Sequence, residues 1–313
     1  MEKKNSDEII VNFSDVSKQY GDLVVLDKLN LEIKKNEMVS IIGPSGSGKT
    51  TVLRVLMTLE KINSGIIHLD GEPLTHMEEK GKIVEASENY LRERRSKIGM
   101  VFQQFNLFPH MTALQNCIEA PIEVLGMNKE EAEQRALELL ELVGLTDKKD
   151  EHPSRLSGGQ QQRVAVARAL VFDPQVVLMD EPLGALDKNL RESMQYEIKH
   201  IHESIGVTVV YVTHDQSEAL TMSNRIAVFN DGKVQQLSSP DKLYEEPVNS
   251  FVAEFIGENN TFAGQITDMS KDQCKVKLND GSEIIANPIS VKTSGDKTTV
   301  SIRPERALSL IHI

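Results

Sequence analysis

The stretch MVSIIGPSGSGKT, residues 38–50, decides the fold of this chain. Its first five residues form a nearly continuous apolar run, which is typical of a strand in a covered parallel sheet. The next eight match the pattern G-x-x-x-x-G-K-[ST], and residues 50–59 are predicted to form a helix. A strand, a glycine-rich loop and a helix in this order let backbone N–H groups surround phosphate oxygens. The stretch therefore predicts an α/β fold that binds a nucleotide.

Strand and helix signals alternate farther along the chain. This alternation is typical of βαβ units and predicts a mainly parallel sheet. An apolar-polar alternation over residues 29–33 predicts a half-buried strand, which we assign to an antiparallel β edge. The later predicted strands are 176–179, 207–212 and 225–229, and the later predicted helices are 189–204 and 215–220.

Three further regions complete the predicted organisation. Residues from about 104 to 172 carry helix signals and are expected to form a helical lobe, whereas the charged stretch 73–97 is expected to be a surface excursion. From residue 261, short alternating segments surround Asn279-Asp280-Gly281, a hairpin signal. We expect an α/β domain over residues 1–245, followed over 246–313 by a linker helix and a small, partial all-β module.

Composition limits the possible functions. The chain has 313 residues, and its net charge is 35 − 47 = −12, which argues against tight binding to nucleic acid. The two cysteines, Cys117 and Cys274, lie far apart, as expected of reduced thiols in a cytosolic protein. The polar N-terminus is not expected to be a secretory signal. Since no apolar run approaches the roughly 20 residues that span a bilayer, any membrane-spanning function would belong to partners.

An acid pair forms the second element of the predicted site. The apolar run 176–179 places Asp180 and Glu181 at the carboxyl end of a strand, the edge where ligands bind in open α/β sheets. Lys49 is expected to reach the β- and γ-phosphates, and Thr50 to bind Mg²⁺ through its hydroxyl. Asp180 would hold Mg²⁺ through water, and Glu181 would polarise the attacking water.

The stretch LSGGQ, residues 156–160, lies between the glycine-rich loop and the acid pair. Ser157 and Gln160 match a capping box, so the stretch predicts the start of a helix. One interpretation is an ordinary helix N-terminus with two permissive glycines. The other is an anion site, because the N–H groups and the positive end of the helix dipole attract phosphate.

With these three motifs in this order, the chain resembles the ATP-binding subunits of ABC transporters over nearly its whole length. The resemblance implies that LSGGQ contacts the γ-phosphate of ATP bound to a second copy of the chain. The active form would then be a dimer around two ATP molecules. The resemblance also implies ATP hydrolysis coupled to transmembrane transport, as in an ABC-type translocase, with ATP and Mg²⁺ as cofactors.

The resemblance assigns roles to further residues. Tyr20 matches the aromatic residue that stacks on adenine, and Gln103 matches the glutamine of the Q-loop, although Gln104 leaves the register open. Asp187 belongs to the D-loop, residues 182–187, and His214 matches the switch histidine that contacts the γ-phosphate. Asp215 and Glu218, which follow His214, have the spacing of a second capping box. The candidate catalytic residues are Glu181, His214, Lys49 and Gln103; the candidate nucleotide-binding residues are Tyr20, Gly43, Pro44, Ser45, Gly46, Ser47, Gly48, Lys49, Thr50, Thr51, Gln103, Ser157, Gly158, Gly159, Gln160 and Asp187; the candidate metal ligands are Thr50, Gln103 and Asp180.

The expected partners follow from the same family. They are a second copy of the chain, transmembrane permease subunits and a substrate-binding protein, with no nucleic acid, and the expected location is the cytoplasmic face of the cell membrane. The run 181–202 resembles the spermidine/putrescine branch, whereas residues 111–127 resemble polar amino-acid and ectoine importers. Polyamine import is therefore the first hypothesis for the substrate, and a polar amino acid, ectoine or another small solute is the alternative.

Residues 255–260 and 301–306 resemble the C-terminal β-barrel, of the OB or TOBE type, that importer ATPases carry. Relatives usually continue past the second stretch, so the module is expected to be either minimal or incomplete. Two other classes of function fit the motifs less well. A soluble, non-transport ABC ATPase usually has two ATPase units or a long coiled coil, and a regulatory module without hydrolysis would not need Lys49, Asp180, Glu181 and His214 together.

Overall fold

The structure is a computed structural model that describes residues 8–79, 82–270, 273–289, 291 and 293–306. The chain divides into two compact units, residues 1–234 and 235–313, which are described separately. The domain boundary expected after residue 245 stays a prediction. None of the helices in the described ranges is both long and apolar enough to cross a bilayer.

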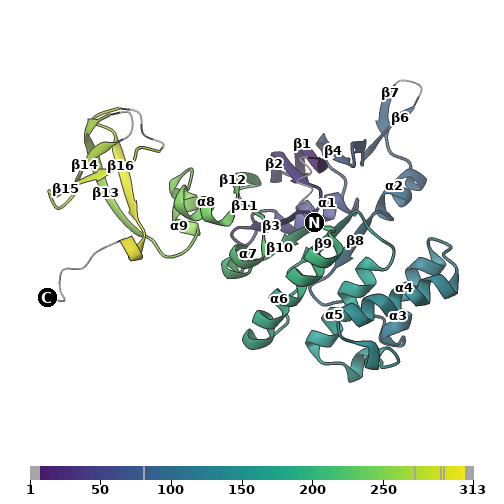
Figure 1. Ribbon diagram of the computed structural model, residues 1–313. Coiled ribbons are helices and arrows are strands. Elements are labelled where there is room, and N and C mark those ends of the chain that lie inside the picture. The colour runs from purple at the N-terminus through teal and green to yellow at the C-terminus, as the bar shows by residue number, and fades with distance from the viewer. Residues whose placement is uncertain (1–7, 80–81, 271–272, 290, 292, 307–313) are drawn as a thin grey trace. The chain divides into compact units, whose positions relative to one another are not determined.

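The core of the first unit is a sheet in the order β12-β11-β3-β10-β9-β8 (Figure 1). The pairs β3–β11, β3–β10, β10–β9 and β9–β8 are all parallel, which confirms the expected mainly parallel sheet. Apolar side chains, mostly Val, Ile, Leu and Met, fill strands β3, β8, β9, β10 and β11 and are largely buried, because helices cover the sheet. Strand β12, which is rich in Lys, Gln and Ser, is more exposed. The strands are β3 (Met38–Ile42), β8 (Ile98–Val101), β9 (Val176–Asp180), β10 (Thr208–Val212), β11 (Arg225–Asn230) and β12 (Lys233–Ser238).

A second, antiparallel sheet in the order β2-β1-β4-β5 forms the expected antiparallel edge. Its long strands alternate buried and exposed residues, as a sheet with one covered face does. The charged excursion contains a two-stranded hairpin and a short helix. These elements are β1 (Ile9–Tyr20), β2 (Leu23–Lys34), β4 (Ser64–Leu69), β5 (Glu72–Pro73), β6 (His76–Glu79), β7 (Lys82–Glu85) and α2 (Glu88–Arg95).

Helices α3 (Ala113–Glu123), α4 (Lys129–Leu142) and α5 (Gly158–Leu170) pack against one another in the region of the predicted lobe, beside β8 in Figure 1. The helix after the glycine-rich loop is shorter than predicted and ends at Leu56, because Thr58 adopts a left-handed conformation with φ of 54°. The helices of this unit are α1 (Lys49–Leu56), α3 (Ala113–Glu123), α4 (Lys129–Leu142), α5 (Gly158–Leu170), α6 (Lys188–Ile205) and α7 (Gln216–Met222).

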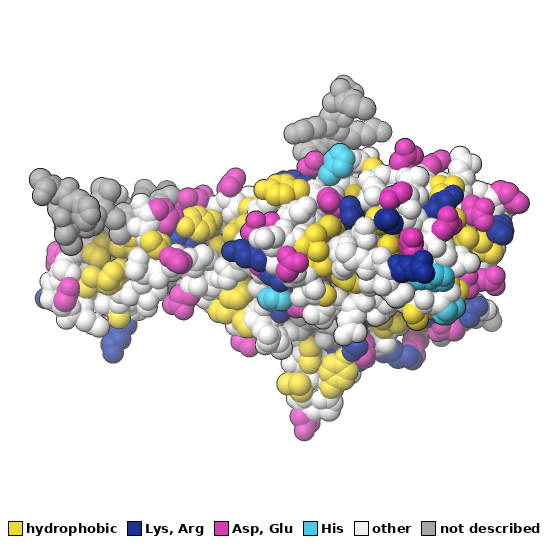
Figure 2. Space-filling model, turned by 90° about the horizontal axis from the view of Figure 1, so that it is seen from below, with side chains coloured by type: hydrophobic (Ala, Val, Ile, Leu, Met, Phe, Trp, Pro, Cys, Tyr) yellow, Lys and Arg dark blue, Asp and Glu magenta, His cyan; other side chains and the backbone are white. Residues whose placement is uncertain are grey.

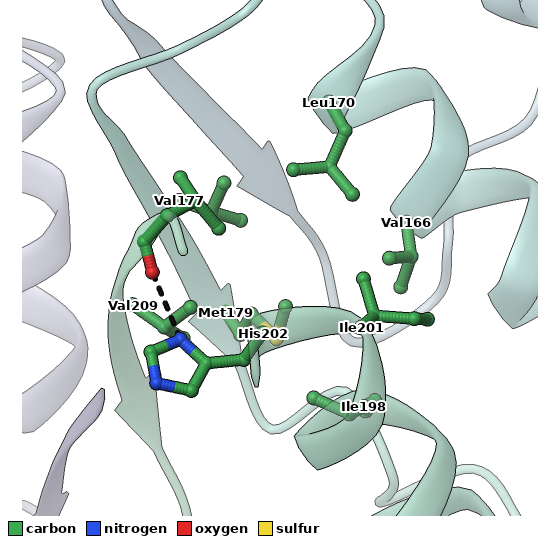
Figure 3. A pocket seen from close by; sticks show the side chains of 9 residues that line it. Val166, Leu170, Val177, Met179, Ile198, Ile201, His202 and Val209 are labelled. Carbon is green, nitrogen blue, oxygen red and sulfur yellow. Dashed lines mark hydrogen bonds between the residues drawn. The ribbon is translucent and has the colours of Figure 1, made fainter. Parts of the chain in front are cut away.

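Helix α6 packs on the sheet around a small apolar cavity (Figure 3). The cavity is lined by side chains from α5, α6, β9 and β10, and His202 is the polar residue among them. The Nδ1 atom of His202 lies 2.9 Å from the carbonyl oxygen of Val207. Burial lowers the pKa of His202, which favours the neutral imidazole.

The second unit contains the predicted small all-β module. Its sheet has the order β15-β14-β13-β16, with all three pairings antiparallel, and the predicted hairpin at residues 279–281 joins β14 to β15. Buried Arg303 donates to the carbonyl oxygens of Ala253 (3.1 Å) and Tyr244 (3.2 Å), which ties the sheet to the two helices of this unit. The elements are α8 (Pro240–Glu245), α9 (Ser250–Phe255), β13 (Asn260–Met269), β14 (Cys274–Leu278), β15 (Glu283–Ala286) and β16 (Lys297–Ile302).

Candidate nucleotide site

The register of the parallel sheet brings the sequence motifs to one edge. Val212 pairs with Asp180 and with Ile41, and Met179 pairs with Val101. The segments that follow these strands are the glycine-rich loop, the acid pair, the stretch with His214 and the stretch with Gln103. Because carboxyl ends of parallel strands form the ligand-binding edge of such sheets, four motifs far apart in sequence meet there.

Two glycines of the loop are required by close backbone contacts. A Cβ on Gly43 would lie 2.2 Å from the carbonyl oxygen of Phe229, and one on Gly48 would lie 2.6 Å from that of Val25. Gly48 also has φ of +104°, a conformation that other residues rarely adopt. The loop is therefore pressed against the backbones of β2 and β11, and its shape depends on glycine.

Lys49 lies inside this loop. Its Nζ donates to the carbonyl oxygens of Gly43 and Pro44, both at 2.8 Å. Burial lowers the pKa of Lys49, while the charges of Glu181 and Asp180 oppose that shift. The Oγ of Ser47 is buried and has no hydrogen-bond partner among the described residues. A buried hydroxyl without a partner and a buried ammonium group fit the oxygens of a phosphate.

The pair Thr50 and Asp180 fits a magnesium ion. The Thr50 hydroxyl donates to Asp180 Oδ1 at 3.4 Å, so two oxygen groups of the kind that Mg²⁺ prefers converge. Burial, followed by the negative charge of Glu181, raises the pKa of Asp180. A divalent cation would offset that unfavourable charge, so the donor set and its electrostatics both suit the ion.

Glu181 stands at the centre of the edge. Its Oε2 accepts from Gln103 Nε2 at 3.3 Å and lies 3.2 Å from His214 Nδ1. The backbone of Glu181 has φ of 46°, the left-handed region, and its N–H donates to the Val212 carbonyl at 2.9 Å. The structure thus brings together three of the predicted catalytic residues in one hydrogen-bonding group beside Asp180.

LSGGQ starts helix α5 as predicted. Ser157 Oγ accepts from the Gln160 N–H at 3.3 Å, and Gln160 Oε1 accepts from the Ser157 N–H at 2.9 Å, which confirms the capping box. Ser157 and Gly158 are exposed, while a Cβ on Gly159 would lie 3.2 Å from Leu190. The polar start of the helix is therefore open to another molecule, and the following turn packs against α6.

Two other predicted residues make local contacts with their own elements. Tyr20 ends β1 and is 43 % exposed, with Lys18 Nζ 4.5 Å from its ring centroid. Asp187 caps α6, since its Oδ1 accepts from the Leu190 N–H at 3.0 Å. The stacking of Tyr20 on adenine and the contact of Asp187 with the nucleotide stay predictions.

One sequence expectation about this edge was wrong. Asp215 and Glu218 match a capping box, and Asp215 Oδ1 does cap α7 by accepting from the Ser217 N–H at 2.8 Å. Glu218, however, turns into the core, where its Oε2 accepts from the hydroxyls of Tyr211 (2.8 Å) and Thr213 (2.7 Å). The two buried hydroxyls need an acceptor, and they take the carboxylate away from the helix end.

Acidic and basic side chains are interspersed over the face of the first unit seen in Figure 2. Nucleic-acid binding favours a continuous basic field. Neither this face nor the net charge of −12 fits that pattern.

Comparison with known proteins decides the family. The model of the ABC transporter family matches residues 26–184, which include the glycine-rich loop, LSGGQ and the acid pair. The chain belongs to the ABC transporter family. It is an ABC transporter ATP-binding subunit, as the sequence predicted.

Relatives of this ABC subunit differ in substrate. It is 49 % identical over 251 residues to the probable amino-acid ABC transporter ATP-binding protein y4tH of Sinorhizobium fredii, covering 80 % of this chain and 97 % of that protein. It is 44 % identical over 291 residues to the spermidine/putrescine import ATP-binding protein PotA of Roseobacter denitrificans, covering 92 % of this chain and 76 % of PotA.

Solved structures agree on the fold. CbiO1 of Clostridium perfringens, part of the ABC transporter complex cbiONQ, matches with a TM-score of 0.69 and 26 % identity, over 77 % of this chain and 92 % of CbiO1. The ATP-binding cassette MJ0796, a dimer bound to ADP and Pi, matches with a TM-score of 0.61 and 39 % identity, over 74 % of this chain and 98 % of MJ0796.

Proposed function

We propose that this chain is the ATP-hydrolysing subunit of an ABC importer, an ABC-type translocase that works as a dimer around two ATP molecules. The observation that carries the proposal is the group at the sheet edge, where Glu181 contacts His214 and Gln103 beside the Thr50–Asp180 pair. The open, capped start of α5 supports the dimer, because its N–H groups suit a phosphate brought by another copy. The dimeric state of MJ0796 accords with this.

The chemistry follows from charge and position. The Glu181 carboxylate would orient a water molecule and accept its proton as the water oxygen attacks the γ-phosphorus. The bond from that phosphorus to the bridging oxygen breaks, and ADP leaves with the electron pair. Lys49 would neutralise charge on the β- and γ-phosphate oxygens, and His214 would contact the γ-phosphate. Mg²⁺, held by Thr50 and Asp180 with Gln103 nearby, would supply further charge neutralisation when bound.

The remaining binding roles complete the proposed site. Tyr20 would stack on adenine, and the loop residues Gly43 through Thr51 would surround the phosphates. Ser157, Gly158, Gly159 and Gln160 would complete the nucleotide site of the other copy, and Asp187 would also contact the nucleotide. Permease subunits would span the membrane, a substrate-binding protein would deliver the solute, and the ATPase would lie on the cytoplasmic face of the membrane.

For the substrate we propose a polyamine, spermidine or putrescine. The support is the similarity to PotA, which extends over 92 % of this chain and so includes much of the C-terminal module. A polar amino acid is the second candidate, because the relative y4tH is 49 % identical and is matched over 97 % of its length.

Two measurements test the proposal. The purified full-length chain should hydrolyse ATP only with Mg²⁺, and absence of Mg²⁺-dependent phosphate release would refute the enzymatic part. Cells that lack the gene should lose uptake of radiolabelled spermidine and putrescine and regain it with the wild-type gene but not with Glu181→Gln. Loss of polar amino-acid uptake alone would instead select the second candidate.

A further inference from the structure

A partly buried charged cluster lies between the D-loop and the segment with His214. Glu218, on α7, is 3 % exposed, and burial raises its pKa. Arg191, on the first turn of α6, faces it, with 3.8 Å between Arg191 Nε and Glu218 Oε1. Sequence motifs assign no role to this pair, and buried charges persist only where they are paired and held.

Glu218 restrains the backbone on both sides of His214. Its Oε2 accepts from the Thr213 hydroxyl at 2.7 Å, and the Thr213 Oγ1 in turn accepts from the Asp215 N–H at 3.0 Å. Thr213 and Asp215 are the two chain neighbours of His214. One buried carboxylate therefore restrains both sides of the residue whose Nδ1 lies 3.2 Å from Glu181.

Arg191 connects this restraint to the D-loop. Its Nη2 donates to the carbonyl oxygen of Leu186 at 3.2 Å, and its Nη1 lies 3.6 Å from Asp215 Oδ2. Leu186 immediately precedes Asp187, the cap of α6. One guanidinium group thus contacts the D-loop backbone, the cap of α7 and the buried Glu218.

The guanidinium is not fully satisfied in this arrangement. Its Nε is buried and makes no hydrogen bond within the described part of the chain, and the two ion pairs are longer than hydrogen bonds. A shift of less than 1 Å between α6 and α7 would convert them into charge-assisted hydrogen bonds, which are roughly twice as strong as neutral ones.

We infer that Arg191 is a positioning residue for ATP hydrolysis, which with Glu218 couples the D-loop to the placement of His214 against Glu181. This inference rests on the proposed function. It assigns Arg191 no contact with ATP, so its loss should lower kcat and leave nucleotide affinity nearly unchanged.

The test compares Arg191→Met with Arg225→Met. Arg225 is the matched control, since its side chain is 24 % exposed against 26 % for Arg191 and it also pairs with a buried carboxylate, Glu37, at 3.0 Å. Arg225 begins β11, at the amino edge of the sheet and away from the candidate site. Because Arg225 donates to Glu37 and to the carbonyl oxygen of Glu32 at 2.8 Å, Arg225→Met should lose at least as much thermal stability as Arg191→Met.

We expect Arg191→Met to lower kcat at least tenfold, with the Kd for MgATP within threefold of wild type, whereas Arg225→Met keeps kcat within threefold. Arg191→Lys, which retains the charge but not the planar fork, should recover part of the lost rate. If Arg191→Met does not fold, Glu218→Gln provides the same comparison, because it keeps the shape and removes the charge.

Amide hydrogen exchange supplies a readout that needs no hydrolysis. In Arg191→Met, exchange should quicken in both residues 187–191 and 215–218, and in Arg225→Met it should quicken in neither. Equal kcat values for the two variants, or unchanged exchange in residues 215–218, would overturn the inference. A wild-type chain without ATPase activity would refute the proposed function instead, and the exchange data would still decide whether Arg191 couples the two segments.

Discussion

Replacing Glu181 with Gln should stop hydrolysis and preserve nucleotide binding. The amide has nearly the same shape as the carboxylate, so the neighbours Gln103 at 3.3 Å and His214 at 3.2 Å still fit around it. The substitution removes the Glu181 charge, which adds to burial in raising the pKa of Asp180. Repulsion of the nucleotide phosphates therefore falls, and ATP affinity should be equal to or higher than that of wild type.

The size of the rate loss follows from the lost proton acceptor. General-base catalysis contributes about 10²–10⁴ in rate, or about 3–5 kcal/mol in the activation free energy. Phosphate release should fall by that factor, and ATP with Mg²⁺ should hold the variant as a dimer in analytical ultracentrifugation. Glu197→Gln, which removes a carboxylate paired with Arg163, is the control of equal charge change. A hydrolysis rate within tenfold of wild type would show that Glu181 is not the general base.

Two further predictions concern stability. Gly48→Ala places a Cβ 2.6 Å from the Val25 carbonyl oxygen. The clash should lower the free energy of unfolding by about 1–3 kcal/mol, which lowers the Tm by roughly 2–10 °C, and ATP binding should weaken. An unchanged Tm would contradict the close contact. Burial depresses the pKa of His202 below its unfolded value of about 6.5, so the stability it contributes is complete above that pH and is lost as pH falls. The free energy of unfolding measured in urea should fall less between pH 7.5 and pH 5.5 for His202→Gln than for wild type. His200→Gln, a change at an exposed position, is the control and should behave like wild type. Equal declines for the three proteins would refute this role of His202.

The sequence predicted the sheet and most of the site residues at its carboxyl edge, because both depend on local patterns. An apolar strand followed by GPSGSGKT specifies its own loop, and parallel pairing then brings Asp180 and Glu181 to the same edge. The capping box of LSGGQ is likewise a local pattern, since Ser157 and Gln160 bond to each other.

The cluster around Arg191 depends instead on tertiary packing. Glu218 has the spacing of a capping residue, but the buried hydroxyls of Tyr211 and Thr213 compete for its carboxylate, and neither is visible in a helix pattern. The sequence did contain one signal for this cluster. Glu218 is a charged residue in a short helix beside Ala219 and Met222, which are both buried.

The central claim is that LSGGQ acts on ATP bound to a second copy of the chain. Mixing the inactive variants Lys49→Ala and Ser157→Arg tests it directly, because a mixed dimer then has one site with an intact loop and an intact LSGGQ from opposite chains. Half of the randomly formed dimers would be mixed, and each would have one of two sites intact. Single-turnover hydrolysis by the mixture should therefore recover about a quarter of the wild-type amplitude, and no recovery above the separate variants would contradict the claim.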